Sequence, residues 1–200
     1  MSDEPDDEID DWSFVDGRIT ETVATTRSED GEPNAAPMGL VKDEKDETAY
    51  ARLWQGSQTL ENIRSTHEVT VNFVRDPVVY VRGALSEVDE DRITDARLND
   101  ADAYVRCDAT HVGEERDGEV ERWRLDAVGG AVENRRITTV NRGFNSVIEA
   151  TVHATRLEFK PELRELFEHH VEVAEKCGGK REREAAELLR ELVKSEEGGK

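Results

Sequence analysis

The sequence predicts a mainly β fold with added α-helix: a small β-barrel followed by a helical C-terminal subdomain. Between residues 18 and 126, short β-branched segments alternate with turn-forming clusters, which is typical of a barrel. After residue 160, apolar side chains recur at helical spacing. We therefore expect an acidic disordered tail over residues 1–13, a barrel domain over 14–130 and a helical subdomain over 131–200.

The first part of the predicted barrel is a hairpin, a third strand and a short helix. Residues 19–26 alternate, and the turn-forming cluster at 28–31 leads into a second strand over 34–41. A third strand is expected over 48–54, and a helix over 59–65.

The second part of the barrel is expected to be mostly strand. Pro77 separates two of its strands, because proline cannot donate to a ladder, and Asp117-Gly118 marks a second hairpin. The expected elements are strands over 69–75 and 78–85, a surface helix over 89–99, and strands over 104–114 and 119–127.

The C-terminal subdomain is expected to contain three helices. Helical spacing is clear over 161–177, where Gly178-Gly179 ends the helix, and again over 181–193. Residues 138–156 match both a strand and a helix. Their length favours the helix, because strands this long are uncommon.

The chain is strongly acidic, with 47 Asp and Glu residues against 27 Lys and Arg and a formal net charge of -20. Acids spread along the chain favour solubility through self-repulsion, and we interpret them as a halophilic adaptation to a salt-rich cytoplasm. No basic stripe is present to replace counterions on phosphates, so a nucleic-acid partner is not expected. Clear apolar periodicity excludes an acidic disordered protein.

The cysteines, the hydropathy of the chain and the histidines argue against several other classes of protein. Cys107 and Cys177 form neither a disulfide framework nor a metal-binding spacing. A secretory signal and an apolar run of membrane-spanning length are both missing, so we expect a soluble, cytoplasmic protein without a membrane partner. His169 and His170 are adjacent and would point about 100° apart on a helix. The other histidines are isolated, and no metal site is expected.

The strongest candidate site is the start of the predicted short helix. Gly56 breaks the third strand, and hydroxyls and amides follow it at Ser57, Gln58, Thr59 and Asn62. A helix start offers unpaired backbone N–H groups and a positive dipole end, which suit a phosphate. The alternative is an ordinary turn in which Ser57 or Thr59 caps the helix.

The second candidate is the strand with small side chains that carries Asn34, Ala36, Pro37 and Gly39. Because these residues lack bulk, a flat apolar ring can approach the backbone closely. An edge strand interrupted by proline explains the same residues equally well. A flat ring on this strand and a phosphate at the helix start together describe flavin mononucleotide (FMN).

An acidic protein that binds an anion also needs a local cation. Arg52, Arg64 and Arg142 are the candidates, because the arginine fork binds phosphate in a bidentate way. Asn141 and Arg142 begin the helical subdomain, where a helix cap and a surface ion pair are an equally good explanation. The sequence does not choose among these arginines.

Together these segments resemble an archaeal family of uncharacterised split-barrel proteins, DUF447, of the flavin-reductase-like FMN-binding type. The resemblance covers the chain from Arg18 onward. It rests on the order of several motifs: residues 21–26, 33–39, 56–63, Val71-Asn72, Asn141-Arg142 and 147–156. It implies an FMN-binding split β-barrel with a helical C-terminal subdomain, and a homodimer with FMN near the subunit interface.

The leading interpretation is an FMN-dependent oxidoreductase that acts on an unknown small molecule. Flavin carries the redox chemistry, so few catalytic side chains are needed, and none is identified. One alternative keeps the barrel but replaces FMN by a deazaflavin or pyridoxal phosphate. Another is a non-catalytic module whose helices dock a partner.

Overall fold

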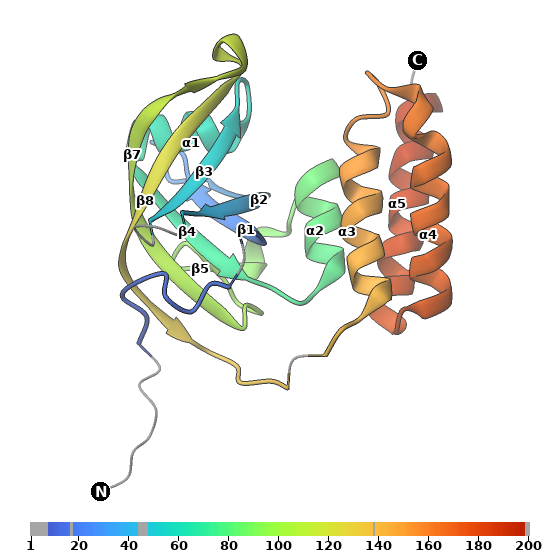
Figure 1. The fold of residues 1–200 in the computed structure, drawn as a ribbon, viewed down its shortest axis with the longest axis horizontal. Coiled ribbons are helices and arrows are strands. Elements are labelled where there is room, and N and C mark those ends of the chain that lie inside the picture. The colour runs from blue at the N-terminus through green and yellow to red at the C-terminus, as the bar shows by residue number, and fades with distance from the viewer. Residues whose placement is uncertain (1–7, 17, 44–47, 138, 199–200) are drawn as a thin grey trace, which may run out of the picture. The chain divides into compact units, whose positions relative to one another are not determined.

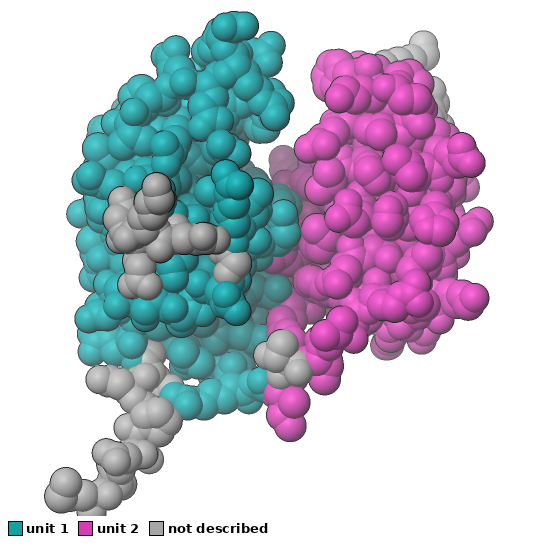
Figure 2. Space-filling model, viewed as in Figure 1, with its two compact units in different colours: residues 1–74, 89–136 teal, residues 75–88, 137–200 magenta. Residues whose placement is uncertain are grey.

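The structure is a computed structural model that describes residues 8–16, 18–43, 48–137 and 139–198. The chain divides into two compact units, shown in different colours in Figure 2. Unit 1 comprises residues 1–74 and 89–136, and unit 2 comprises 75–88 and 137–200. A short segment from the middle of the chain therefore belongs with the C-terminal residues, which the sequence did not predict.

Unit 1 is a closed antiparallel barrel with the strand order β1-β2-β3-β8-β7-β4 (Figure 1). Its strands are β1 (Ile19–Arg27), β2 (Pro33–Lys42), β3 (Ala49–Trp54), β4 (Glu68–Phe73), β7 (Ala103–Glu115) and β8 (Val120–Val132). Each of these strands was expected from sequence, as were the β1–β2 and β7–β8 hairpins. Alternation along the strands directs one face into an apolar core.

Helix α1 (Gln58–Thr66) contributes to the core of the barrel, and its prediction is confirmed. Leu60 and Ile63 are fully buried among the side chains of the strands. The described residues before β1 also pack on unit 1. The Ile9 N–H donates to the Gly130 carbonyl at 3.0 Å, and Trp12 is buried. Residues 8–13, expected as part of an acidic disordered tail, thus pack on unit 1 in the structure, while residues 1–7 lie outside the described residues.

The strand predicted over 78–85 is wrong, because these residues form helix α2 (Pro77–Leu85). The Asp76 carboxylate caps the helix by accepting the Val78 N–H at 3.0 Å, and Pro77 occupies the first turn. Proline is favoured there because its missing N–H would have no helical partner. The valine-rich run suggested a strand, but burial in unit 2 overrides that weak propensity.

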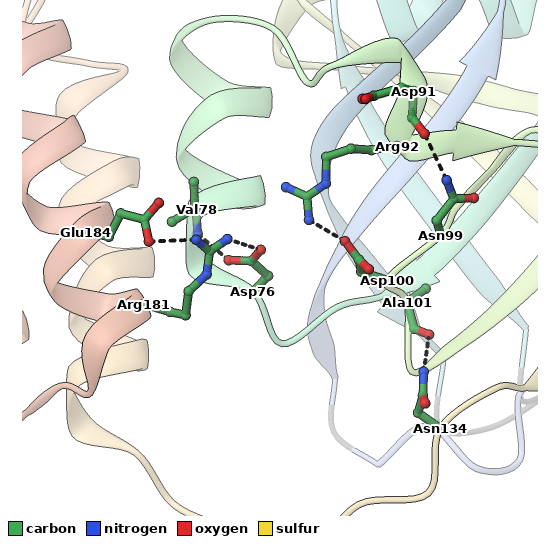
Figure 3. A network of polar contacts seen from close by, with 10 residues as sticks. All are labelled: Asp76, Val78, Asp91, Arg92, Asn99, Asp100, Ala101, Asn134, Arg181 and Glu184. Carbon is green, nitrogen blue, oxygen red and sulfur yellow. Dashed lines mark hydrogen bonds and ion pairs between the residues drawn. The ribbon is translucent and has the colours of Figure 1, made fainter.

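The surface helix predicted over 89–99 is also wrong. Only Glu90–Arg92 form a single 3-10 turn, and strands β5 (Ile93–Thr94) and β6 (Arg97–Leu98) follow as a small hairpin. Asp95 and Ala96 between them adopt positive φ angles of 50° and 60°, the turn conformation that suits a tight hairpin. Figure 3 shows the polar contacts that hold this segment, including Arg92 to Asp100 at 2.6 Å.

Unit 2 consists of α2 together with α3 (Arg142–Ala154), α4 (Arg164–Cys177) and α5 (Lys180–Gly198). The ambiguous residues 138–156 thus contain a helix, as their length favoured. A buried apolar cluster joins all four helices, with Phe167 and Leu189 among its largest members. Arg181 on α5 pairs with Asp76 at the start of α2 (Figure 3). No helix in the described parts of the chain is long and apolar enough to cross a membrane.

Candidate functional site

Side chains from β1, β2 and α1 meet in a hydrogen-bonded cluster inside unit 1. The β1–β2 register places Thr26 directly opposite Asn34. The Asn34 amide donates to the Thr26 hydroxyl at 3.3 Å and to the Thr59 hydroxyl at 3.1 Å. One asparagine therefore joins both strands of the hairpin to the first turn of α1.

Two further amides complete the cluster. The Asn62 amide donates to the Thr26 hydroxyl at 3.0 Å, and its carbonyl oxygen accepts from Gln58 at 2.8 Å. We call this cluster, formed by Thr26, Asn34, Gln58, Thr59 and Asn62, the α1 network. Its two threonines and Asn62 are buried, while Gln58 at its end is exposed. The network is preorganised because its members hold one another in place.

The hydroxyl groups of the α1 network keep donor capacity for a ligand. Thr26 accepts two N–H donors and Thr59 accepts one. Each hydroxyl also carries a proton, and among the described residues no hydrogen bond uses either proton. A ligand that only accepts hydrogen bonds, such as a phosphate oxygen, fits this arrangement.

The start of α1 offers backbone donors beside the network. Gly56 takes a φ of +77° at the turn, a conformation that favours glycine. Ser57 caps the helix: its Oγ accepts the Leu60 N–H at 3.3 Å and donates to the Trp54 carbonyl at 2.8 Å. Among the described residues, neither the Gln58 N–H nor the Thr59 N–H donates a hydrogen bond. These two groups and the helix dipole favour an anion.

The small-residue strand borders the same hairpin. β2 pairs with β1 from Pro33 to Val41, but with β3 only over Leu40–Lys42. The second edge of residues 33–39 therefore has no strand partner in the described barrel. Ala36, Pro37 and Gly39 are all partly exposed, so this edge is accessible to a ligand as well as close to Asn34.

The three candidate arginines occupy different places. Arg52 on β3 is half exposed and pairs with Glu115 at 3.1 Å. Arg64, in the last turn of α1, pairs with Glu121 and donates to Gln55. Arg142 is the first residue of α3 in unit 2, so its relation to the α1 network stays a prediction.

Arg52 lines a polar cavity of about 380 Å³ on unit 1, together with Arg18, Lys42 and Arg122. The Arg122 guanidinium lies over the Tyr50 ring, 3.8 Å from its centroid. Neither Ser57 nor the members of the α1 network line this cavity. The structure thus associates Arg52 with a separate basic surface.

A second cavity, of about 290 Å³, adjoins the α1 network through Thr26. Cys107 lines it, and burial raises the pKa of this thiol well above its ordinary value. A thiol in that state is not a nucleophile, because only the thiolate is reactive. The cavity therefore offers space beside the network without an activated cysteine.

Thr26 is a site residue that the sequence did not single out. It was expected only as part of a strand and of a segment in the family resemblance. Its signal was the turn at residues 28–31, because a hairpin closed there aligns Thr26 with Asn34. The i, i+4 spacing of Gln58 and Asn62 likewise indicates their contact on one helix face.

Comparison with protein families gives two matches. The model described as "Protein of unknown function (DUF447) N-terminal domain" matches residues 20–134, and "Protein of unknown function (DUF447)" matches residues 141–191. Among solved structures, the chain is similar to an FMN-bound protein of the same family from Methanosarcina mazei. The two sequences are 31% identical, the match covers 90% of this chain and 97% of the other, and the TM-score is 0.79.

Two further solved structures are more distantly similar to the chain. The flavin reductase of styrene monooxygenase from Pseudomonas putida is 14% identical over 58% of this chain and 82% of its own, with a TM-score of 0.45. An FMN-binding protein from Thermus thermophilus is 15% identical over 61% and 74%, with a TM-score of 0.47. The assignment rests instead on the two family models and on the Methanosarcina structure, which confirm the resemblance: the chain belongs to the DUF447 family.

Proposed function

We propose that this chain binds FMN, with the flavin phosphate at the start of α1. The observation that carries the proposal is the free donor capacity at this point. Two backbone N–H groups and two hydroxyl protons lack intramolecular acceptors within the described residues, although the side chains around them are hydrogen-bonded. The FMN found in a family member of 31% identity supports the same ligand.

Each part of the site has a distinct role in this proposal. Gln58, Thr59 and Thr26 present the phosphate donors. Gly56 and Ser57 form the turn and the cap that start the helix, and Asn62 fixes Gln58 and Thr26 in position. Asn34 joins the phosphate end to the edge of β2, where Ala36, Pro37 and Gly39 receive the ring. Arg52 and Arg142 are the two candidates for the compensating cation, although Arg52 lies on a separate basic surface.

We further propose that the protein is an oxidoreductase acting on a small molecule. Bound FMN would supply hydride or electron transfer. The chain's own contribution is to bind and orient: the α1 network fixes the phosphate, and the small side chains of β2 keep one edge of the ring accessible. The cavity beside Thr26 gives a neighbouring space of about 290 Å³, near the lower limit of typical small-molecule sites.

FMN binding is tested by titrating flavin-free protein while following flavin fluorescence. We expect saturable binding that Thr59→Val weakens about tenfold or more, because one hydroxyl contact to a charged group contributes about 1.5–3 kcal/mol. Thr151→Val is the matched control: it removes a buried helical hydroxyl in unit 2, which donates to the Val147 carbonyl at 2.8 Å. Failure to take up FMN, or equal affinities in both variants, would overturn the proposal.

The same protein separates the alternative ligands. Thermal unfolding with FMN, a deazaflavin or pyridoxal phosphate identifies the binder as the compound with the largest concentration-dependent shift. Reduction of bound FMN by NADH or NADPH, with transfer to an acceptor, supports the oxidoreductase. Tight FMN binding without reduction by either donor favours the non-catalytic module.

Dimerisation and salt adaptation are further parts of this proposal. A barrel with an uncovered strand edge benefits from a second copy that covers it, so we expect a homodimer in light scattering after gel filtration. With 47 acidic residues in the chain, we also expect the thermal midpoint to rise as salt screens their repulsion. A monomer, or a midpoint independent of salt, would contradict the respective expectation.

A further inference from the structure

Unit 2 contains a cluster of possible metal ligands that is independent of the flavin proposal. Helix α3 carries Glu149 and His153, four residues apart and thus on one face of the helix. Helix α4 carries His170 and lies beside α3 (Figure 1). The two helices share the buried cluster around Phe167 and Val171. One potential ligand atom from each of the three side chains lies within 4.8 Å of the other two.

The two imidazole rings face each other closely. Their centroids are 5.4 Å apart and their planes differ by 36°. His169, the neighbour of His170 in sequence, is exposed, whereas His153 and His170 are partly buried. Only one of the two adjacent histidines therefore turns toward α3.

Both facing histidines have an unsatisfied nitrogen. The Nδ1 atoms of His153 and His170 are buried without a hydrogen-bond partner in the described structure. Leaving a buried polar atom unpaired costs about 1–3 kcal/mol. Two such atoms on facing rings indicate that the protein alone does not complete this site.

We propose that Glu149, His153 and His170 bind a divalent transition-metal ion, with Zn²⁺ as the expected occupant, and that the ion joins α3 to α4. Two imidazole nitrogens and one carboxylate oxygen suit Zn²⁺, Co²⁺ or Ni²⁺, whereas Mg²⁺ and Ca²⁺ prefer oxygen ligands alone. Three protein ligands leave a coordination position for water.

The surroundings support this assignment. His153 and His170 are partly buried, so both rings are held between the two helices with little access for water. The Glu149 carboxylate is exposed, so its side chain can adjust to an ion with little cost in packing. The ligand atoms need to close by a small distance, because metal–nitrogen bonds are about 2.0–2.1 Å.

The test uses tag-free, full-length, flavin-free protein stripped with a chelator. Excess Mg²⁺ is present to occupy the many surface carboxylates. We expect Co²⁺ to bind at one ion per chain with a visible ligand-field band, and Zn²⁺ to displace it. We also expect Zn²⁺ to raise the thermal midpoint in a concentration-dependent manner.

Variants locate the ion. Loss of a residue that only hydrogen-bonds a metal ligand weakens metal binding about 10- to 100-fold. Glu149→Gln, His153→Gln and His170→Gln each remove a ligand itself, so each should weaken Zn²⁺ binding by about tenfold or more. His169→Gln and Cys177→Ser remove an exposed imidazole and an exposed thiol of the same unit, and both should bind as the parent does. Because Glu149 is exposed, its variant remains informative if a histidine variant fails to fold.

Three results would overturn the proposal. The first is the absence of a ligand-field band and of a thermal shift with Zn²⁺, Co²⁺ and Ni²⁺. The second is parental affinity in Glu149→Gln, which leaves the histidines intact. The third is an equal loss in His169→Gln, which would place the ion elsewhere on α4.

Discussion

The start of α1 in unit 1 differs from the starts of α2 and α3 in unit 2 in the charge of the side chains that surround it. In unit 2, Asp76 caps α2, and Asn141 caps α3 by accepting the Gly143 N–H at 2.9 Å while donating to Glu182 at 2.7 Å. A carboxylate of the protein thus stands at or beside each of these starts. In unit 1, α1 begins with the neutral Ser57 and a network of neutral amides and hydroxyls.

This difference separates a structural helix start from one that suits a ligand. All helix starts attract anions because of the dipole and the unpaired N–H groups. Where a carboxylate of the chain already takes that place, a ligand gains little. Glu61, the acid in the first turn of α1, makes no hydrogen bond to the N–H groups there among the described residues, so that place is open to an external anion.

The strongest test of this difference between helix starts is to add a negatively charged side chain at the start of α1. Ser57→Asp keeps a good cap, because aspartate and serine are about equally favoured there, but it brings a negative charge to the phosphate position. Two like charges about 4 Å apart repel by about 4 kcal/mol in a partly exposed site. We expect FMN affinity to fall at least about 100-fold, with stability unchanged or slightly raised.

Ser57→Asn is the control for this charge, since it caps equally well and stays neutral. Its FMN affinity should remain within about threefold of the parent, which corresponds to less than about 1 kcal/mol. If both variants bind FMN as the parent does, the phosphate does not lie at α1.

The opposite change removes the negatively charged side chain beside the start of α3 in unit 2. Glu182 is buried, and its carboxylate accepts from the Asn141 amide and from the Gly179 N–H at 2.8 Å. We expect Glu182→Ala to lower the free energy of unfolding by about 2–3 kcal/mol, because both donors lose a charged acceptor. Urea unfolding measures this loss, and FMN affinity should be unchanged.

Glu187→Ala on the exposed side of α5 is the reference, with an expected change within about 0.5 kcal/mol. An equally small effect at Glu182 would mean that the carboxylate is dispensable for the start of α3.

Local sequence patterns predicted most of the fold. They also predicted the start of α1 in unit 1, but not the start of α2 in unit 2. The strand alternation, the helix at α1 and the cap at Ser57 follow from residues close in sequence. Asp76-Pro77 was also a local signal, since an N-cap acid followed by proline begins a helix. The valines after it were given more weight, and their packing on α3 and α5 depends on contacts remote in sequence.

Side-chain contacts between residues far apart in sequence could not be predicted from local sequence patterns. The α1 network requires the β1–β2 register as well as the position of α1, and no local period encodes both. The cluster of Glu149, His153 and His170 was missed for the same reason. His153 and His170 lie on different helices, and only packing of α3 against α4 brings them together.

The other end of α1 supplies a pH-dependent test. The Glu121 carboxylate accepts from Arg64, from the Trp123 indole at 3.0 Å and from Gln55 at 3.1 Å. The Arg64 hydrogen bond is the main cause that lowers the pKa of Glu121, and burial opposes it. A lowered folded-state pKa contributes stability above the ordinary glutamate value of about 4.3, and that stability is lost as the pH falls through the folded value.

Glu121→Gln should therefore destabilise the protein at neutral pH, and the difference from the parent should shrink toward zero as the medium becomes acidic. Comparing the two proteins at each pH cancels the titration of the other acids. Denaturant unfolding between neutral pH and about pH 3 provides the measurement. A difference that stays constant with pH would assign the loss to packing and not to charge.

The smallest expected effect concerns the cation that accompanies the phosphate. Arg52 already pairs with Glu115, whereas the exposed Arg142 has no ion-pair partner among the described residues. We therefore expect Arg142→Gln to weaken FMN binding about fivefold at low salt, since an exposed charge pair contributes up to about 1 kcal/mol. Arg52→Gln should change it by less than about twofold, because its charge is already partly neutralised. The Arg142 effect should fade as salt screens it, so a larger loss for Arg52→Gln would move the phosphate to the basic cavity on β3.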